Sequence, residues 1–395
     1  MIGTSRHFSK PPAPRYEENQ AKNSVDNPLL SFILQAGQNR EVAMNRLIML
    51  TIALTGLWYG SSFSQQPVFG PPANLGPKIN TALHQLDPFL TADGKKLFFA
   101  DGADIWFSEM ADTGWTNAVK LGPQINYGIH LQVSPSVSPD GQKLYYVDAS
   151  RDDYNWDIWV STWDFSINDW GAAQNLGWPV NTQGIEHSVR IGSDGQHLYF
   201  YSSVSDSVDS LNPNGRCGFY VSEWAGTDWS IPTSFGANYY CASSDYPSIT
   251  ADLKELFYHQ YVSDGTSIFV NCLSRIGWGP QIDLRSQIGG RAATPFITPS
   301  GDSLFFSGTP DLGGNGGADI WMIKRILSGD LNLDSQLTTA DIVLELNKVF
   351  AGEPFSAPAA AGELNCDGQF SPVDVVLILR LVFEQNTLST EMENP

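Results

Sequence analysis

Two acidic segments near the C-terminus carry side chains whose type and spacing suit the binding of a divalent cation. Oxygen-bearing side chains at positions 1, 3, 5 and 12 of a loop, with a backbone carbonyl at position 7, wrap Ca²⁺. The residues at these positions are Asp330, Asn332, Asp334 and Asp341 in the first segment, and Glu363, Asn365, Asp367 and Asp374 in the second. The sequence therefore predicts two calcium-binding loops.

A second group of side chains could perform acid–base chemistry, provided that the fold brings its members together. Paired carboxylates at a suitable separation act as acid and base in glycoside hydrolysis. The candidates are Asp87, Glu186, His187 and Asp245, which lie far apart in the sequence. Their chemistry therefore depends on the elements that position them.

Those elements belong to a repeat made of two short units, each present five times. The first unit is an aromatic residue followed six residues later by a large apolar one: Phe69/Leu75, Trp115/Leu121, Trp170/Leu176, Trp229/Phe235 and Trp278/Leu284. The second is a turn followed by a run such as Leu-Phe-Phe, with its turn residue at Asp93, Asp140, Asp194, Asp252 and Ser300. Repeats of roughly 50 residues that each hold short strands indicate the blades of a β-propeller.

The two units are out of phase, and this stagger predicts how the ring closes. The chain begins with a copy of the first unit, Phe69 to Leu75, whereas the module from Ala292 has three strands and stops near Lys324. We expect the first copy to supply the fourth strand of the last blade, since closure removes open sheet edges. The count predicts a mainly β, five-bladed propeller over residues 65–326. A six-bladed ring with one degenerate blade is the alternative.

One repeat resembles a known family. The stretch from Ser138 to Tyr146, followed by Trp156-Asp157-Ile158-Trp159, is similar to the TolB-type, WD-like propeller repeat, and the resemblance extends over about residues 68–325. It implies a binding platform whose ligand, a glycan or a protein, lies at the channel mouth where the innermost strands begin. By our alignment the mouth residues are Leu86-Asp87, Val133-Ser134, Glu186-His187, Asp245-Tyr246 and Ala293-Thr294.

Each acidic loop near the C-terminus leads into a segment with apolar residues at helical spacing, Ile342 to Phe350 and Val375 to Phe383. Two such loop–helix units 33 residues apart resemble a type I dockerin over residues 328–386, with 387–395 as a tail. The resemblance implies two Ca²⁺ ions bound by the loop residues above, with the carbonyls of Gln336 and Gln369 at position 7. It also implies a cohesin-like or other protein partner.

By the same resemblance, partner contacts fall on Thr339-Ala340 in one copy and Pro372-Val373 in the other. Because these pairs differ, two-way symmetric docking is not expected. Ser335 replaces the usual turn glycine of loop one, and Glu363 replaces the usual aspartate of loop two. The alternative is that both acidic turns cap their helices without metal.

The N-terminal sequence predicts an export signal. Residues 44–64 combine a basic start, an apolar run from Leu47 to Tyr59 and small residues at Ser62 and Ser64, as in a signal peptide. We expect residues 1–43 to be an upstream extension that is not part of the native protein. We expect a secreted or cell-surface protein, or a periplasmic one, without a membrane span after cleavage. An uncleaved anchor is the alternative.

Export permits disulfide bridges, and Cys217 and Cys241 fall in the same repeat and form the favoured pair, although other pairings stay open. The net charge of −20, without a basic cluster, excludes nucleic acid as an expected partner. The sequence thus predicts a non-catalytic binding propeller with a calcium-dependent docking module. The competing hypothesis is a glycoside hydrolase, or an accessory protein of extracellular polysaccharide breakdown, with catalytic carboxylates at the channel mouth.

Overall fold

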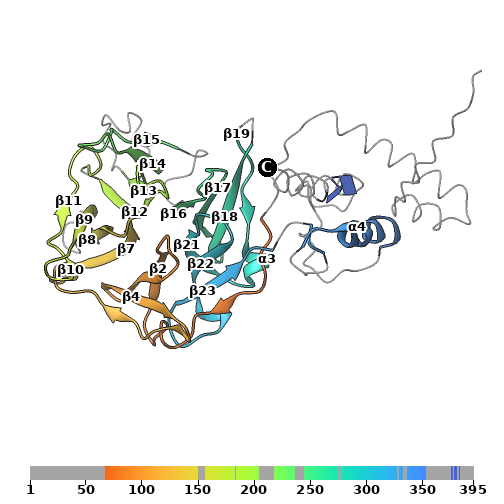
Figure 1. Ribbon diagram of the computed structural model, residues 1–395, viewed down its shortest axis with the longest axis horizontal. Helices are drawn as coiled ribbons and strands as arrows, with labels where there is room; N and C mark the ends of the chain where they lie inside the picture. The colour runs from red at the N-terminus through yellow and green to blue at the C-terminus, as the bar shows by residue number, and fades with distance from the viewer. Residues whose placement is uncertain are drawn as a thin grey trace, which may run out of the picture. The chain divides into compact units, whose positions relative to one another are not determined.

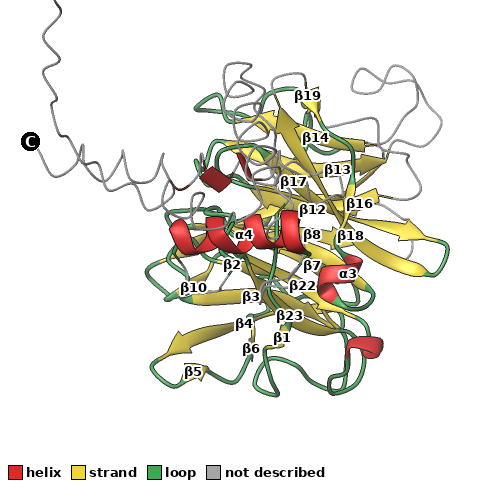
Figure 2. Cartoon of the chain, turned by 90° about the vertical axis from the view of Figure 1, so that its right-hand side faces the viewer, coloured by secondary structure: helices red, strands yellow, loops and turns green. Residues whose placement is uncertain are grey.

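The computed structural model describes residues 67–149, 156–182, 184–203, 218–235, 244–274, 277–326, 329–331, 336–352, 375–376, 378–379 and 382. The predicted upstream extension and signal peptide, residues 1–64, lie outside these ranges, as do Cys217 and Cys241. Strands dominate the described chain, and helices are few (Figure 2). Among the described residues, no helix has the length and apolar character needed to cross a membrane.

The strands form five antiparallel sheets arranged as the blades of a propeller (Figure 1). Blade 1 contains β2 (Gln85–Leu90), β3 (Lys96–Asp101), β4 (Asp104–Ala111), β5 (Gly114–Trp115) and β6 (Val119–Lys120). Blade 2 contains β7 (Leu131–Val137), β8 (Lys143–Ala149), β9 (Trp156–Asp164), β10 (Asp169–Trp170) and β11 (Gln174–Asn175). Blade 3 contains β12 (Ile185–Ile191), β13 (His197–Ser203), β14 (Gly218–Glu223) and β15 (Thr233–Ser234).

Blade 4 contains β16 (Ser244–Ile249), β17 (Glu255–Val262), β18 (Gly265–Ser274), β19 (Gly277–Trp278) and β20 (Ile282–Asp283). Helix α3 (Arg285–Ile288) leads into blade 5, which contains β21 (Ala292–Ile297), β22 (Ser303–Gly308) and β23 (Asp319–Lys324), with the short helix η1 (Pro310–Leu312) between the last two. The first strands of the blades, β2, β7, β12, β16 and β21, gather around the centre of the ring (Figure 1). The predicted count of five blades is confirmed.

The predicted ring closure is also present. Strand β1 (Ala73–Asn74) pairs with β23, and Phe69 forms an isolated bridge with Arg325. The ladder continues through hydrogen bonds from Gly70 N to Lys324 O (2.9 Å) and from Ile326 N to Val68 O (2.8 Å). The N-terminal strand therefore completes the last blade and leaves no unpaired outer edge at β23.

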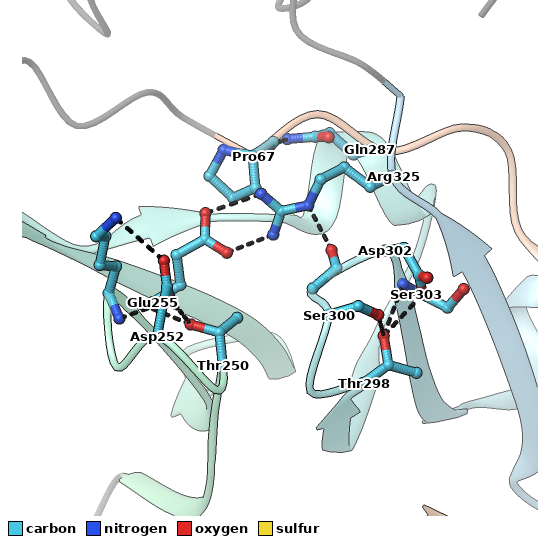
Figure 3. Close-up of polar contacts among 12 residues, drawn as sticks. Pro67, Thr250, Asp252, Glu255, Gln287, Thr298, Ser300, Asp302, Ser303 and Arg325 are labelled. Atoms are coloured by element: carbon cyan, nitrogen blue, oxygen red, sulfur yellow. Dashed lines mark hydrogen bonds and ion pairs between the residues drawn. The ribbon is translucent and has the colours of Figure 1, made fainter. Parts of the chain in front are cut away.

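Side chains from both ends of the ring meet beside this joint (Figure 3). Arg325 makes a two-point ion pair with Glu255 of blade 4 and donates from Nε to the carbonyl of Gly301 (2.5 Å). Its guanidinium also lies over the ring of Phe69, 5.4 Å from the ring centre. Gln287 of α3 accepts a hydrogen bond from Phe69 N (2.8 Å). These contacts tie the first and last residues of the propeller to its fourth blade.

The apolar runs that follow each turn form the core because their alternate residues face the neighbouring blade. The second strands bury Leu97, Leu144, Leu198, Leu256 and Leu304 completely, and the aromatic residues beside them pack between sheets. Burial of each large apolar side chain stabilises the fold by roughly 2 kcal/mol of transfer free energy. Because the contact recurs in every blade, it is the main source of stability.

The turns before these strands need a left-handed residue, and four blades place glycine there. Gly94, Gly141, Gly195 and Gly301 have φ between 67° and 76°. Leu253 occupies the same position in blade 4 with φ of 59°. Leucine in this region is strained, since its Cβ approaches the following carbonyl oxygen.

Outside the propeller, one helix of the C-terminal segment is described at length. Helix α4 (Thr339–Ala351) begins with a capping box in which Thr338 and Asp341 each bond the other's backbone N–H. It covers the predicted amphipathic segment from Ile342 to Phe350. Residues of the second predicted segment, such as Val375 and Val382, are helical and buried. The paired-loop domain itself is not shown, because most of its loop residues lie outside the described residues.

Candidate functional site at the propeller axis

A left-handed, non-glycine residue recurs once per blade on the innermost strand. The residues are Asp87 (φ 56°), Ser134 (53°), Ser188 (60°), Tyr246 (61°) and Thr294 (47°). Each coincides with a shift in the register between the first and second strands of its blade, which is a β-bulge. The bulge, with its left-handed residue, recurs five times around the axis. It orients side chains and backbone N–H groups toward the centre and toward neighbouring blades.

The bulges correct one position of the sequence alignment. Four of the five predicted mouth pairs are in register, but in blade 3 the equivalent pair is His187-Ser188, not Glu186-His187. The left-handed residue lies six positions before the turn residue in every blade, so the spacing of Ser188 and Asp194 sets the register of blade 3 as it does elsewhere. Glu186 therefore corresponds to Gln85 of blade 1 and Gln132 of blade 2.

Glu186 is completely buried and its carboxylate is occupied by hydrogen bonds from its own blade. It accepts from Thr182 N (3.0 Å), Thr182 Oγ1 (2.6 Å) and Ser202 Oγ (2.8 Å). Burial raises the pKa of this carboxyl group above its ordinary value, and these hydrogen bonds oppose the rise. The geometry assigns Glu186 to holding the loop before β12.

Asp87 also lies inside the ring and connects three blades. Its Oδ2 accepts from Ser134 N (2.9 Å) and Ser134 Oγ (3.1 Å) of blade 2, while its own N–H donates to Thr294 Oγ1 (3.2 Å) of blade 5. Burial raises its pKa, and the nearby charge of Arg190 opposes the rise. Asp87 is thus an interior polar link between blades.

Arg190 is a buried cation at the centre of the ring, and sequence analysis did not single it out. Its guanidinium donates to Val189 O (3.1 Å) and at longer range to Pro135 O and Pro88 O (both 3.4 Å), and it lies 5.9 Å from the ring centre of Phe296. These partners belong to blades 1, 2, 3 and 5. Burial lowers the pKa of Arg190 to about 10. Its side chain lines a cavity of about 110 Å³ near the ends of the innermost strands.

At the opposite end, where the innermost strands begin, Asp245 lies between two histidines. Its Oδ1 is 3.6 Å from His187 Nε2, and its Oδ2 is 3.9 Å from His259 Nε2. Both separations exceed hydrogen-bond length. The exposed fractions of the side chains are 19% for Asp245, 12% for His187 and 3% for His259. The structure therefore brings together two of the four predicted candidates and adds His259.

Aromatic rings surround these three side chains. The His187 ring centre is 4.5 Å from that of Tyr201, 5.8 Å from Trp156 and 5.8 Å from Tyr246. The His259 ring centre is 5.0 Å from Tyr246 and 5.1 Å from Tyr261. We call this set the mouth cluster, and its members are Trp156, His187, Tyr201, Asp245, Tyr246, His259 and Tyr261. It draws on blades 2, 3 and 4.

The electrostatics of the mouth cluster follow from its partial burial. Desolvation lowers the pKa of His187 and of His259 to about 3, so that both rings are neutral at pH 7. Desolvation also raises the pKa of Asp245 to about 6, which leaves this carboxyl group ionised at pH 7. The charge of Asp245 in turn contributes to a raised pKa at Tyr246 and Tyr261. A single negative charge thus sits among neutral rings.

The orientation of His259 bears on whether this set could hold a metal ion. Its Nδ1 accepts a hydrogen bond from Thr294 N (3.2 Å), so the neutral ring carries its proton on Nε2, which faces Asp245. Metal-binding histidines show the reverse arrangement, with the outer nitrogen donating. Within the described residues, no group of three or more His, Cys, Asp or Glu side chains is arranged to hold a metal ion.

In the predicted calcium loops, only a few candidates fall within the described residues. Asp330 and Asp341 are both buried, and Asp341 accepts from Leu331 N (2.9 Å) and Thr338 N (2.9 Å). Gln336, Thr339 and Ala340 are exposed. The other candidates lie outside the described residues: Asn332, Asp334, Glu363, Asn365, Asp367, Gln369, Pro372, Val373 and Asp374.

Sequence analysis missed His259, yet a signal for it was present. It follows the Leu-Phe-Tyr run of blade 4 at a position that holds Ala100, Val147, Tyr201 and Ser307 in the other blades. A titratable residue at a position that is otherwise apolar or uncharged marks a departure from the repeat. Arg190 stands out for the same reason against Phe89 and Phe296.

The strand pairing and the axial residues define a five-bladed β-propeller with a polar and aromatic site at one end of its axis. No protein-family model matches the chain, and no curated protein matches it. Among solved structures, a protein assigned as TolB from Agrobacterium tumefaciens shares 13% identity and a TM-score of 0.40, over 65% of this chain and 96% of the other. An aldose sugar dehydrogenase from Escherichia coli shares 11% identity and a TM-score of 0.41, over 65% and 99%.

Proposed function

We propose that this chain is an exported, non-catalytic propeller that binds a protein or glycan ligand through the mouth cluster. We further propose that a dockerin-like, calcium-dependent module follows the propeller and attaches it to a protein partner. The observation that carries the first proposal is Asp245, a part-exposed carboxylate among aromatic rings that makes no hydrogen bond within the described part of the chain. Such convergence of apolar rings and one polar group is typical of a ligand site.

The geometry favours binding over glycoside hydrolysis. Hydrolysis needs two carboxyl groups that both face the substrate, one as acid and one as base or nucleophile. Of the predicted candidates, Glu186 is saturated with hydrogen bonds and Asp87 is buried inside the ring, so Asp245 alone reaches the surface. We expect no release of reducing sugar when the full chain is incubated with plant and algal glycans. Hydrolysis that disappears in Asp245→Asn would favour the enzyme instead.

Two described residues support the calcium module. Asp330 and Asp341 are buried carboxylates on either side of the first loop, and Asp341 accepts the backbone N–H of Leu331, the second residue of that loop. Hard oxygen donors of this kind fit Ca²⁺. When bound, the ion would neutralise their charge and order the loops, and the same Asp341 would still begin helix α4.

Calorimetric titration of the full chain with Ca²⁺ tests the module. We expect two equivalents to bind, and chelator to lower the melting temperature of the C-terminal segment. Asp341→Ala should lose one equivalent, whereas Thr338→Ala should keep both, because it removes the capping hydroxyl and leaves the carboxylate. If Asp341→Ala loses helix but still binds the same amount of Ca²⁺, the acidic turn acts only as a helix cap and the proposed calcium site is wrong.

Attachment is tested by affinity capture from the secreted fraction, with the full chain as bait and with or without chelator. A partner retained only with Ca²⁺, and lost in Asp341→Ala, supports docking. N-terminal mass spectrometry of the secreted form tests export: a first residue at Gln65 is expected, and a peptide from residues 1–43 would contradict the proposed start.

A further inference from the structure

We propose that the mouth cluster binds an organic ammonium cation, with Asp245 as the counter-charge and the surrounding aromatic rings as its walls. The inference rests on the proposed binding function and narrows the ligand to one chemical class. The cationic group could belong to a small quaternary amine or to a lysine side chain of a protein, and the two sources share a positive charge that a carboxylate and aromatic ring faces attract.

Asp245 differs from the other carboxylates around the axis because it lacks a hydrogen-bond donor in the described part of the chain. Glu186 accepts from Thr182 and Ser202, Asp87 accepts from Ser134, and Asp148 contacts His130 Nδ1 at 2.7 Å. Among the described side chains, those that approach the carboxylate of Asp245 as possible charge partners are the two histidines, at 3.6 and 3.9 Å. A carboxylate that is largely removed from water and poorly partnered is costly, so a ligand that supplies a donor gains the corresponding free energy.

The missing partner is a cation rather than another neutral donor. Both histidines are neutral at pH 7, and within the described residues no lysine or arginine forms an ion pair with Asp245. Arg190, which is the buried cation of the axis among the residues that the structure describes, acts on Asp87 and Tyr246. Charge-assisted hydrogen bonds are about twice as strong as neutral ones. A primary ammonium group supplies such a bond, and a quaternary ammonium group, which has no N–H, supplies the positive charge alone, so each satisfies the carboxylate better than a neutral hydroxyl group does.

The rings of the mouth cluster suit an ammonium group in a second way. Tyrosine and tryptophan faces attract cations, and several rings around one charge make the aromatic cage that recognises quaternary ammonium groups. Tyr246 contacts both histidines, and Tyr261 is more than half exposed at the edge of the set. Asp245 acts electrostatically on both phenols, as it does on Tyr201. The aromatic rings thus pack around the two histidines that flank the carboxylate of Asp245.

Two further observations agree with an organic cation. The orientation of His259, whose Nδ1 accepts from Thr294 N, leaves a protonated Nε2 beside Asp245 and does not suit a metal ion. The net charge of −20 attracts cations at long range and repels anions. Because that field acts on every cation, the test needs a neutral molecule of the same shape.

The experiment is a calorimetric titration of the full chain at pH 7.5 and moderate salt with three probes. Choline represents the quaternary source, Nα-acetyl-lysine methylamide represents the lysine source, and 3,3-dimethylbutan-1-ol is the neutral counterpart of choline. We expect at least one cation to bind at least tenfold more tightly than the neutral alcohol. The cation that binds more tightly identifies the source.

Three variants locate the binding. Asp245→Asn should weaken cation binding at least tenfold, and Tyr261→Leu should weaken it about fivefold because one ring face is lost. Asp252→Asn is the control: it makes the same charge change at an exposed turn and can keep its Oδ1 hydrogen bonds from Thr250 and Lys254, so binding should not change. Thermal melting of each variant confirms that it folds, and Tyr261→Leu still tests the site if Asp245→Asn does not fold.

Failure of both cations to bind more tightly than the neutral alcohol, or cation binding unchanged in both mouth variants, would overturn the inference. Failure of this inference can be distinguished from failure of the proposed binding function. A glycan or protein ligand could lose binding in Trp156→Ala and Tyr261→Leu, still bind Asp245→Asn, and not be displaced by choline. That result would support the proposed binding function and contradict recognition of a cation.

Discussion

Glu186 in blade 3 and Gln85 in blade 1 hold the same loop in the same way. Each receives the backbone N–H of the threonine four residues before it, Thr182 or Thr81, at 3.0 Å, and each bonds that threonine's hydroxyl group. In blade 1 the neutral amide of Gln85 makes these hydrogen bonds. The charge of Glu186 is therefore unnecessary for the structure.

Glu186→Gln should consequently fold with a free energy of unfolding within about 1 kcal/mol of the wild type, because an amide can donate to Thr182 Oγ1 as Gln85 does in blade 1. Glu186→Ala should lose about 2 kcal/mol, since it leaves the donors of Thr182 and Ser202 unpaired in the interior. Urea denaturation compares the two variants. A loss in Glu186→Gln as large as that in Glu186→Ala would show that the negative charge itself matters.

Leu253→Gly should stabilise the propeller by about 1 kcal/mol, because it relieves the left-handed backbone of leucine at a turn where four blades have glycine. The Leu253 side chain is 45% exposed, so little apolar burial is lost. Leu253→Ala is the matched control, since it shortens the side chain but keeps Cβ, and it should bring no gain. Thermal denaturation of both variants decides. Equal stability of the two would place the effect in the leucine side chain rather than in the backbone.

Arg325→Ala should lower the free energy of unfolding by about 2 kcal/mol, because it removes a part-buried, two-point ion pair with Glu255 and the bond to Gly301 O. Lys254→Ala, next to Glu255, breaks the exposed pair with Asp252 and should change stability by less than about 0.5 kcal/mol. Chemical denaturation at two salt concentrations measures both. A similar small loss for the two variants would mean that the joint in Figure 3 contributes no more than a surface pair.

Phe69→Ala should cost about 3 kcal/mol, since this ring is 2% exposed and packs against Phe257 with centres 6.1 Å apart. Phe165→Ala makes the same chemical change at a ring that is 75% exposed, and its effect should be within about 0.5 kcal/mol. Urea denaturation compares the two variants, and limited proteolysis should show early cleavage near the closing strand in Phe69→Ala alone. Wild-type stability in that variant would contradict closure by the N-terminal segment.

Asp245→Asn should raise stability at pH 7.5 by about 2 kcal/mol, because burial raises the pKa of Asp245 from 3.8 to about 6 and the folded state disfavours its charge. For an acid with a raised pKa, the wild type gains stability as the pH falls from above 6 toward 4. The advantage of the variant should therefore shrink over that window. The groups that face Asp245 are His187, Tyr201, Tyr246, His259 and Tyr261, and none of them titrates between pH 4 and 7.5.

Melting temperatures of the wild type and Asp245→Asn at pH 5.0, 6.0 and 7.5 check this prediction. A variant that is less stable than the wild type at pH 7.5 would mean that the carboxylate stabilises the ring. If Asp245→Asn gains stability and loses ligand binding, the carboxylate serves binding at the expense of stability.

The ring could be predicted from the sequence because its signals are local and repeated. The Asp-Gly turns and the apolar runs at Leu97 or Leu144 specify hairpins, and the spare copy from Phe69 specifies the closing strand. The β-bulges could not be predicted, because they depend on the approach of neighbouring blades. The same bulge recurs six residues before the turn residue of every blade, and this spacing places Ser188 at the bulge of blade 3 and Glu186 two residues before it.

The site was predictable only in part for the same reason. Asp245 and His187 were visible as polar residues at the start of innermost strands, whereas His259 faces them from the second strand of blade 4. Sequence spacing relates residues along one strand, and the pairing of Asp245 with His259 across two strands exists only once the register is set. Arg190 likewise reaches partners in four blades that no local pattern connects.

The position of β23 within its sheet has a mechanical consequence. This strand is hydrogen-bonded on one side to β22 and on the other to β1, and the chain leaves it at Lys324 toward the C-terminal segment. A force applied at the C-terminal end of β23 and along that strand would load the ladder bonds on both of its edges in shear instead of opening them one after another. The strand order that closes the ring would thus also keep β23 in its sheet under a force applied at its C-terminal end.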